Sequence, residues 1–421
     1  MRTRKDFGTP LVAIALPTGT VANTTAQTDT LATMTTTKSS VKIRAIWTGD
    51  GSILVNGTPI TNGVEVDIAP DSDGSLTLTA SGTVSFTSLY CFNNSLTSLD
   101  VSGCTALQTL ICNDNSLTSL NVSKCTELQM LFCNMNSLTT LDVSGCKVLT
   151  RLYCNSNSLT TLDVSKYPEL QTLFCDNNSL ITLDMSGCTE LTDLWCNNNS
   201  LTTLDVSGCK ALTRLYCNNN SLTTFDVSKC TELTDLWCNN NSLTSLDVSE
   251  CTELQTLVCY NNPLTTLDVS KCTALTILSC STNSLTTLDV SGLTALTQLY
   301  CQNNSLTSLD VSKCTELEML ICDNNSLTSL NLSGCTELNT LNTDNQAISV
   351  TKSGSNYATP ITYTLPDGSL QSINVDNSTY AYDSPLEGPT SGNTLTFTTD
   401  YKPSSEFSHP FSGILTLESY T

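Results

Sequence analysis

A cysteine recurs every 21 residues through more than half of this 421-residue chain. Each of these cysteines lies in the frame L-x-x-L-x-C-x-x-N-x-L-x-x-L. The cysteines of this first column are Cys91, Cys112, Cys133, Cys154, Cys175, Cys196, Cys217, Cys238, Cys259, Cys280, Cys301 and Cys322. A fixed period of this length predicts a solenoid, in which structural repeats stack and each repeat contacts only its neighbours.

The residues around each cysteine alternate between apolar and variable positions, which predicts a short strand. In the second repeat, Leu110 and Cys112 would face the core and Ile111 would face outward. One strand per repeat gives a parallel sheet. A unit of 21 residues leaves no room for a full α-helix, so we expect turns and short 3₁₀ pieces on the convex side. Asn115, three residues after the cysteine, is expected to satisfy neighbouring backbone groups, and its stacked copies should form a ladder.

The frame resembles that of leucine-rich repeats, with cysteine at a position that is usually leucine. The order of a β cap, the repeats, and a segment beginning Asn345-Gln346 that leads into a β domain is similar to bacterial internalin-like proteins. This resemblance implies a secreted or surface protein that binds host or neighbouring proteins through its concave sheet. The repeat is shorter than in that class and carries cysteines, so the identity of a partner cannot be transferred.

The two ends of the chain differ in composition from the repeats. Four short alternating runs separated by turn residues predict a small antiparallel unit before the repeats, and strand-like runs predict a β-sandwich-like unit after them. The expected division is residues 1–40, a possible signal segment and Thr-rich linker; residues 41–85, an N-terminal β cap; residues 86–348, the leucine-rich repeats; and residues 349–421, a C-terminal β domain.

The first 22 residues have some features of a secretory signal. Arg2, Arg4 and Lys5 precede a short apolar run from Leu11 to Leu16, which Pro17 closes. Export by this segment is one interpretation, and a disordered tail is the alternative. Either interpretation leaves the repeats as the part of the chain that carries function.

The charge balance excludes several classes of partner. The formal net charge is −22, with 39 acidic against 17 basic residues, which disfavours nucleic acid and anionic membrane surfaces. The sequence contains no run of 18 apolar residues, so it predicts no membrane span. The sequence shows no nucleophile–base pair, phosphate-binding loop or paired acids, so we expect neither an enzyme nor a cofactor.

The second column of cysteines indicates a role in the core. It comprises Cys104, Cys125, Cys146, Cys188, Cys209, Cys230, Cys251, Cys272, Cys314 and Cys335. Tyr167 and Leu293 fill its two remaining places, so an apolar side chain is tolerated there. We expect buried free thiols, since stacked strands are roughly 4.8 Å apart and a disulfide prefers Cβ atoms about 3.8 Å apart. Some disulfides, or metal binding, remain alternatives, although the chain has a single histidine.

An aspartate column follows the same period. Its members are Asp100, Asp142, Asp163, Asp184, Asp205, Asp226, Asp247, Asp268, Asp289 and Asp310, with Asn121 and Asn331 in the two other places. The Asp-Val-Ser context favours a side chain that accepts hydrogen bonds from the next turn, a role that asparagine fills equally well. Calcium binding by the stacked carboxylates is the alternative.

The residue before each first-column cysteine is expected to point out of the concave sheet. Six consecutive repeats carry an aromatic residue there, and the residue two places earlier is charged in several of them. The predicted partner-binding residues are Phe132, Tyr153, Phe174, Asp193, Trp195, Arg214, Tyr216, Asp235 and Trp237. An exposed aromatic stripe of this length favours a binding surface. The alternative is that cross-strand stacking merely stabilises the sheet.

Together these features predict a non-enzymatic recognition protein, secreted or at the cell surface, that holds a host or bacterial protein in its concave face. A carbohydrate-binding module and a structural spacer without a ligand are the alternatives. The sequence leaves the oligomeric state, the partner's identity and the redox state of the cysteines open.

Overall fold

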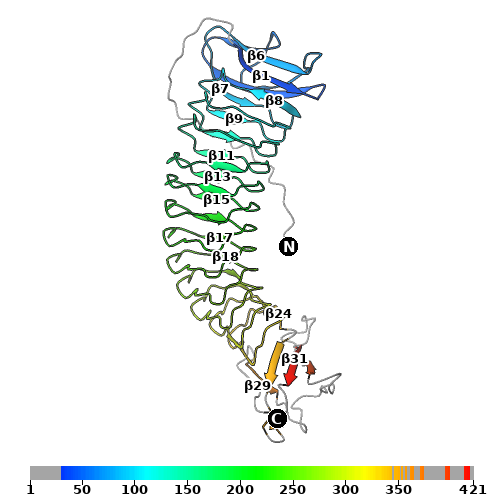
Figure 1. Cartoon of the computed structure of the whole chain (residues 1–421), viewed down its shortest axis with the longest axis vertical. Coiled ribbons are helices and arrows are strands. Elements are labelled where there is room, and N and C mark those ends of the chain that lie inside the picture. Colours follow the sequence, from blue (N-terminus) through cyan, green and yellow to red (C-terminus); the bar gives the residue numbers. More distant parts are fainter. Residues whose placement is uncertain are drawn as a thin grey trace.

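The computed structural model describes residues 30–343 and, beyond them, residue 346 and a set of strands between residues 346 and 417. The chain forms an elongated, gently curved stack of strands, with an antiparallel cap at the N-terminal end (Figure 1). The predicted leucine-rich repeat solenoid is therefore confirmed. The described residues contain strands but no helix, and hence no helix that could cross a membrane.

A single sheet of 15 strands runs the length of the solenoid. Its repeat strands pair in parallel with a shift of 21 residues, as in the pairing of Leu194 with Leu215. This register places equivalent residues of successive repeats side by side. The strands are, in order along the chain, β2 (Val41–Thr48), β5 (Glu65–Ile68), β7 (Ser85–Tyr90), β9 (Thr109–Ile111), β10 (Met130–Phe132), β11 (Arg151–Tyr153), β13 (Thr172–Phe174), β15 (Asp193–Trp195), β16 (Arg214–Tyr216), β17 (Asp235–Trp237), β18 (Thr256–Val258), β19 (Ile277–Ser279), β20 (Gln298–Tyr300), β22 (Met319–Ile321) and β24 (Thr340–Asn342).

The other side of each repeat returns the chain through two tight turns. In one repeat the N–H of Cys188 donates to the carbonyl of Met185 at 2.9 Å, and the N–H of Leu191 donates to the carbonyl of Cys188 at 3.4 Å. The return segments between residues 86 and 343 contain turns and bends without a 3₁₀ residue. They also carry a second row of short parallel pairings, which the sequence did not predict, in β12 (Thr161–Asp163), β14 (Thr182–Asp184), β21 (Ser308–Asp310) and β23 (Ser329–Asn331).

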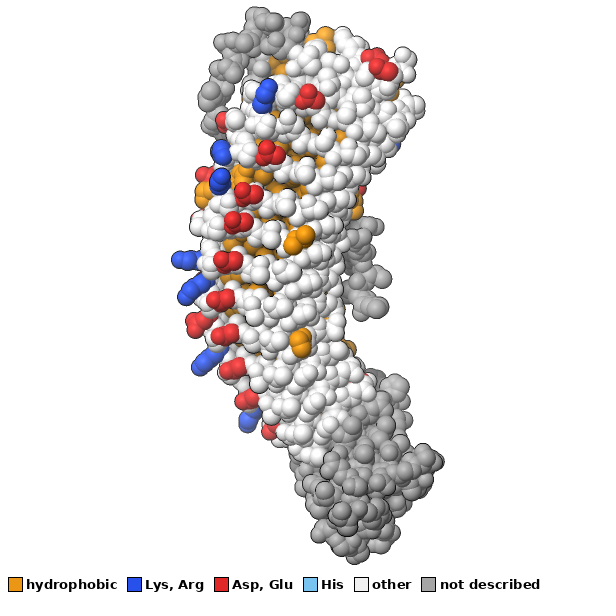
Figure 2. All heavy atoms as spheres, viewed as in Figure 1, with side chains coloured by type: hydrophobic (Ala, Val, Ile, Leu, Met, Phe, Trp, Pro, Cys, Tyr) orange, Lys and Arg blue, Asp and Glu red, His pale blue; other side chains and the backbone are white. Residues whose placement is uncertain are grey.

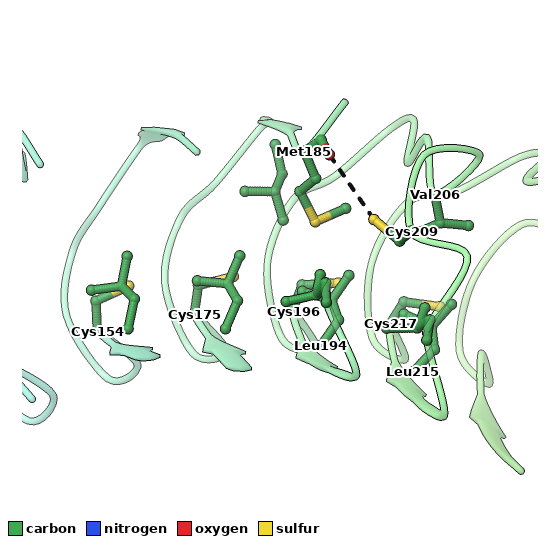
Figure 3. Packing of buried hydrophobic residues seen from close by; sticks show 14 of the residues in the cluster. Cys154, Cys175, Met185, Leu194, Cys196, Val206, Cys209, Leu215 and Cys217 are labelled. Carbon is green, nitrogen blue, oxygen red and sulfur yellow. Dashed lines mark hydrogen bonds between the residues drawn. The ribbon is translucent and has the colours of Figure 1, made fainter. Parts of the chain in front are cut away.

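The two cysteine columns lie in the core between these rows (Figure 3). All 22 cysteines are buried free thiols, as predicted. The first column packs beside the leucines of the long sheet, and burial raises the pKa of a thiol such as Cys133 to about 12. Thiols of the second column also form weak hydrogen bonds. For example, the thiol of Cys188 donates to the carbonyl of Val164 at 3.1 Å. These cysteines therefore behave as small core side chains.

The predicted asparagine ladder is present, and it joins neighbouring repeats. The side-chain oxygen of Asn199 accepts from the N–H of Leu180 at 2.9 Å, in the preceding repeat. Its amide donates to the carbonyls of Cys196 at 3.0 Å and of Cys175 at 3.1 Å. Each asparagine thus satisfies backbone groups of two repeats that would otherwise be buried without partners.

The ladder is closed at both ends. At the N-terminal end, Asn94 exchanges two hydrogen bonds with the backbone of Lys42 in the cap, at 2.9 and 2.6 Å. At the C-terminal end, Gln346 stands where asparagine is expected. Its oxygen accepts from the N–H of Leu327 at 2.9 Å, and its amide donates to the carbonyl of Cys322 at 3.0 Å. The longer side chain therefore performs the same role in the last described repeat.

The aspartate column caps the return turns, as the capping interpretation predicts. The carboxylate of Asp142 accepts from the N–H of Ser144 at 2.8 Å, and Asn121 accepts equally from Ser123 at 3.0 Å. The hydrogen bonds from Ser144 lower the pKa of Asp142 below its ordinary value. Figure 2 shows acidic side chains in a row along the repeats, with basic side chains beside them.

The N-terminal cap shares both rows of the solenoid. The antiparallel strands β2 and β7 extend the long sheet, and a second sheet has the order β4-β3-β6-β1-β8. Its members are β1 (Thr30–Thr36), β3 (Ser52–Val55), β4 (Thr58–Pro59), β6 (Ser75–Ser81) and β8 (Leu96–Asp100). The prediction of a linker up to residue 40 is wrong for β1, because Leu31, Ala32 and Met34 are buried in the core. Residues 1–29, with the possible signal, lie outside the described residues.

Strands also occur where the C-terminal β domain was expected. They are β25 (Gln346–Val350), β26 (Lys352–Ser353), β27 (Asn356–Tyr357), β28 (Ile361–Thr364), β29 (Leu370–Ile373), β30 (Thr394–Thr398) and β31 (Ser412–Leu417). Strand β28 pairs in parallel with β23, so the second row of the solenoid continues into this segment. The residues between these strands lie outside the described part of the chain, and the sandwich-like arrangement stays a prediction.

Candidate binding face

Six aromatic side chains lie side by side on the solvent-facing side of the long sheet. They belong to consecutive strands from β10 to β17, and the parallel register aligns each with the next. Successive side chains of a strand point to opposite faces of the sheet. The leucine before each ring and the cysteine after it are buried in the core, so each ring points to the solvent side. We call this set the aromatic row: Phe132, Tyr153, Phe174, Trp195, Tyr216 and Trp237.

The rings of the aromatic row change orientation along the solenoid. The ring centroids of Phe132 and Tyr153 are 4.2 Å apart, with an interplanar angle of 3°. At the other end, the centroids of Tyr216 and Trp237 are 5.6 Å apart, with an angle of 65°. The first four rings are stacked, so their faces cover one another and their edges are left for solvent. Trp237 ends the row and is 41% exposed.

A charged pair lies beside the row, on the same face. The Nε–H of Arg214 forms an ion pair with the carboxylate of Asp193 on the neighbouring strand. The hydrogen bond from the Arg214 guanidinium to the Asp193 carboxylate is the main cause of the raised pKa of Arg214. The side chain of Asp193 is 12% exposed and that of Arg214 is 52% exposed, so the pair is anchored at its carboxylate and open at its guanidinium.

Two threonines hold the carboxylates of this face in place. The hydroxyl of Thr192 donates to Asp193 at 3.0 Å, and that of Thr234 donates to Asp235 at 2.8 Å. The sequence prediction missed both threonines. The repeated tetrapeptide Thr-Asp-Leu-Trp, at residues 192–195 and 234–237, was the signal that could have revealed them.

The structure brings all nine predicted site residues together on one face, over six neighbouring strands. The rings of neighbouring strands are also stacked on one another, and stacked ring pairs generally contribute beyond the area that they bury. Burial raises the pKa of Tyr153 and of Tyr216, so both hydroxyls are neutral donors at physiological pH. No group of three or more His, Cys, Asp or Glu side chains placed to hold a metal ion occurs among the described residues.

Family comparisons identify the repeats. A model described as "Leucine Rich repeats (2 copies)" matches residues 231–272, and a "Leucine Rich repeat" model matches residues 92–109 and 197–213. None of the curated proteins compared with this chain matches it.

Several solved structures of bacterial proteins are similar to this one. The functional domain of InlJ from Listeria monocytogenes, which includes a cysteine ladder, is 28% identical over 81% of this chain and 94% of that chain, with a TM-score of 0.47. The internalin InlF from Listeria monocytogenes is 22% identical over 62% of this chain and 87% of that chain, with a TM-score of 0.54. A leucine-rich repeat protein of Leptospira interrogans is 26% identical over 59% of this chain and 75% of that chain, with a TM-score of 0.49. The family matches, the 21-residue frame and the solenoid together identify the repeats of this chain as leucine-rich repeats, in a fold similar to that of InlF.

Proposed function

We propose that this protein is an exported, non-enzymatic recognition protein that binds a protein partner through the aromatic row and the charges beside it. The observation that carries the proposal is the concentration of six aromatic side chains and the Asp193–Arg214 pair on one solvent-facing surface. Tyr, Trp and Arg are the residue types that dominate the energetics of protein interfaces. A leucine-rich repeat fold of this kind also points to protein interaction.

The orientation of the rings favours a protein over a glycan. A sugar stacks on an aromatic face, and the faces of Tyr153 and Phe174 are both covered by neighbouring rings. The exposed edges carry the positive end of the ring quadrupole, which suits carbonyl oxygens and apolar side chains of a protein. The exposure of Trp237 leaves one ring that a sugar could use, so glycan binding is the second candidate.

A structural spacer would need the row only for stability. Stacking accounts for the first four rings, but it does not account for Trp237, which is turned edge-on to Tyr216 and is exposed. Nor does stacking require an ion pair with an open guanidinium beside the row. These two features support a surface that meets a partner.

The test uses a double variant, Trp195→Ala with Trp237→Ala, and a matched control, Tyr300→Ala. Tyr300 occupies the same column, but Val258 and Ser279 separate it from the aromatic row. Wild type, variant and control would be presented to host-cell surface proteins, with hits verified by purified-protein binding, and to a glycan array. We expect the verified protein hit to be retained by the control and lost by the double variant, with all three chains folded by circular dichroism.

Three other outcomes would count against the proposal. Partner capture by the double variant equal to wild type would exclude the aromatic row as the site. A specific glycan hit that depends on Trp237 would favour the carbohydrate alternative. A loss of thermal stability in the double variant, with no ligand for any of the three chains, would favour the spacer. Export would be tested separately, by N-terminal sequencing of the protein recovered from the culture medium.

A further inference from the structure

The charges beside the aromatic row lie in one column. Along the aromatic row, each residue of this column comes two residues before a residue of the row, as Arg151 comes before Tyr153. From β10 to β18 this column reads Met130, Arg151, Thr172, Asp193, Arg214, Asp235 and Thr256. The column one residue earlier is neutral over the same strands, being Thr or Gln throughout. The charge pattern of this part of the face therefore depends on four side chains.

The two inner charges of this column neutralise each other. Arg214 is in register with Asp193 on one side and with Asp235 on the other, and it pairs with Asp193. The inner pair is therefore already satisfied before any partner binds.

The two outer charges form no ion pair within the described part of the chain. Arg151 is half-buried, and its guanidinium donates a weak hydrogen bond to the sulfur of Met130 at 3.7 Å. Asp235 is also half-buried and accepts from the hydroxyl of Thr234; it lies beside Arg214 and interacts with its charge, but forms no ion pair with it. Asp176 does not lie beside Arg151: it follows the C-terminal end of β13, buried and accepting from the amide of Asn177, whereas Arg151 is in register with Thr172.

The separation of the outer charges is fixed by the sheet. Arg151 in β11 and Asp235 in β17 are four strands apart in the sheet order, which at about 4.8 Å per strand is roughly 19 Å. Tyr153, Phe174, Trp195, Tyr216 and Trp237 span the same interval beside them. The face therefore presents a positive end, a negative end and an apolar band alongside.

We infer that the protein partner places a carboxylate on Arg151 and an ammonium or guanidinium group on Asp235, with apolar side chains over the rings between them. This inference rests on the proposed function and names the chemistry of its partner. A bound surface without these groups would desolvate two half-buried charges and leave them unpaired, which is strongly unfavourable. Opposite charges at both ends would also set the direction in which the partner lies along the solenoid.

The test is a selection from a random dodecamer peptide library displayed on phage. An extended peptide rises about 3.3 Å per residue, so roughly six residues cover the interval between the two charges. The targets are the full chain, the swapped double variant Arg151→Glu with Asp235→Lys, and the neutral double variant Arg151→Gln with Asp235→Asn. We expect peptides selected on wild type to carry an acidic and a basic residue about six apart, flanking apolar residues, and to bind the swapped variant at least tenfold more weakly.

The variants separate this inference from the proposed function. Synthetic versions of the selected peptides that exchange their acidic and basic residues should regain binding to the swapped variant, and the neutral variant should bind both versions with intermediate affinity. Peptides that are lost on the Trp195/Trp237 variant but bind the swapped variant unchanged would overturn the charge inference and leave the proposed function standing. Peptides insensitive to both double variants, or no enrichment on wild type, would overturn both.

Discussion

The hydroxyl of Tyr167 donates a hydrogen bond to the backbone carbonyl of Val143, 24 residues earlier in the chain. At the equivalent place in the next repeat, the thiol of Cys188 donates to the carbonyl of Val164, also 24 residues earlier. A phenol and a thiol thus perform the same task in the same column. The column therefore requires a side chain that fills the core, as the buried Leu293 also does, and a donor is used where the side chain has one. The reactivity of sulfur has no part in this role.

Removing the donor at Tyr167 tests this role. Tyr167→Phe keeps the ring and leaves the buried carbonyl of Val143 without that donor, so we expect a loss of about 1 kcal/mol in the free energy of unfolding. Urea denaturation followed by circular dichroism measures it. Tyr260→Phe, at a half-buried position on the sheet face, is the matched control and should change the value by less than about 0.5 kcal/mol. Equal effects of the two substitutions would contradict a specific role for the Tyr167 hydroxyl.

The buried thiols should be chemically inert in the folded protein. Burial raises the pKa of Cys217 and of Cys280 to about 12, so at pH 8 roughly one such thiol in ten thousand is the reactive thiolate. We expect no reaction with a thiol-specific chromogenic disulfide at pH 8 over an hour, and reaction of all 22 cysteines once urea unfolds the chain. Rapid labelling of a subset in native buffer, mapped by mass spectrometry, would show that part of the core is open.

The aspartate caps should make stability depend on acid pH. The pKa values of Asp142, Asp163 and Asp205 are lowered by hydrogen bonds from serines, below an ordinary value of 3.8. Their contribution is therefore complete above that value and is lost as the pH falls through the lower folded-state pKa. The triple variant with asparagine at these positions should keep its neutral-pH stability within about 0.5 kcal/mol, since Asn121 makes the same bond.

Urea midpoints at pH 7 and between pH 4 and 2 check this prediction. The wild type should lose more stability over the acid range than the triple variant. The same proteins test the calcium alternative. A calcium-dependent rise in the melting temperature of the wild type, absent from the triple variant, would show that the carboxylates bind metal in addition to capping the turns.

Two glycines at equivalent positions should respond differently to the same substitution. A Cβ atom at Gly187 would lie 2.0 Å from the carbonyl oxygen of Ser165, whereas one at Gly292 would lie 3.4 Å from that of Ser270. Gly187→Ala must push neighbouring repeats apart, and we expect it to cost about 1–3 kcal/mol. Gly292→Ala should be neutral or stabilise slightly. Thermal melts of both variants decide the matter, and indistinguishable melting temperatures would refute the prediction.

The period of the sequence predicts most of the solenoid, because one register is repeated and each column must suit one environment. It places Leu194 and Cys196 in the core and Trp195 outside. The pattern did not predict β1, since threonines dominate Thr30–Thr36 and its buried residues become recognisable only when β6 and β8 are known to flank it. The second row of parallel pairings was likewise missed, because Thr161–Asp163 is too short to be recognised as a strand.

The 21-residue spacing of the sequence predicted which residues form the candidate site, but it did not predict how their side chains are oriented. Parallel register fixes which rings are neighbours, whereas their angles depend on side-chain torsions that the repeat does not specify. The charges show the same limit. Arg214 lies between Asp193 and Asp235 at equal strand separation, and only the three-dimensional structure selects the pair with Asp193.

The asparagine ladder has a consequence for how such a gene can change in length. Asn199 bonds to the backbone of its own repeat and of the preceding one through groups that every repeat offers at the same place. If 21 residues are removed or duplicated anywhere within the array, each asparagine side chain still meets the same backbone N–H and carbonyl groups in the repeat that precedes it. Recombination between repeats can therefore lengthen or shorten the array in whole units without breaking its internal bonding. The variable outward residues are shuffled in the process, so new surfaces arise on an unchanged interior.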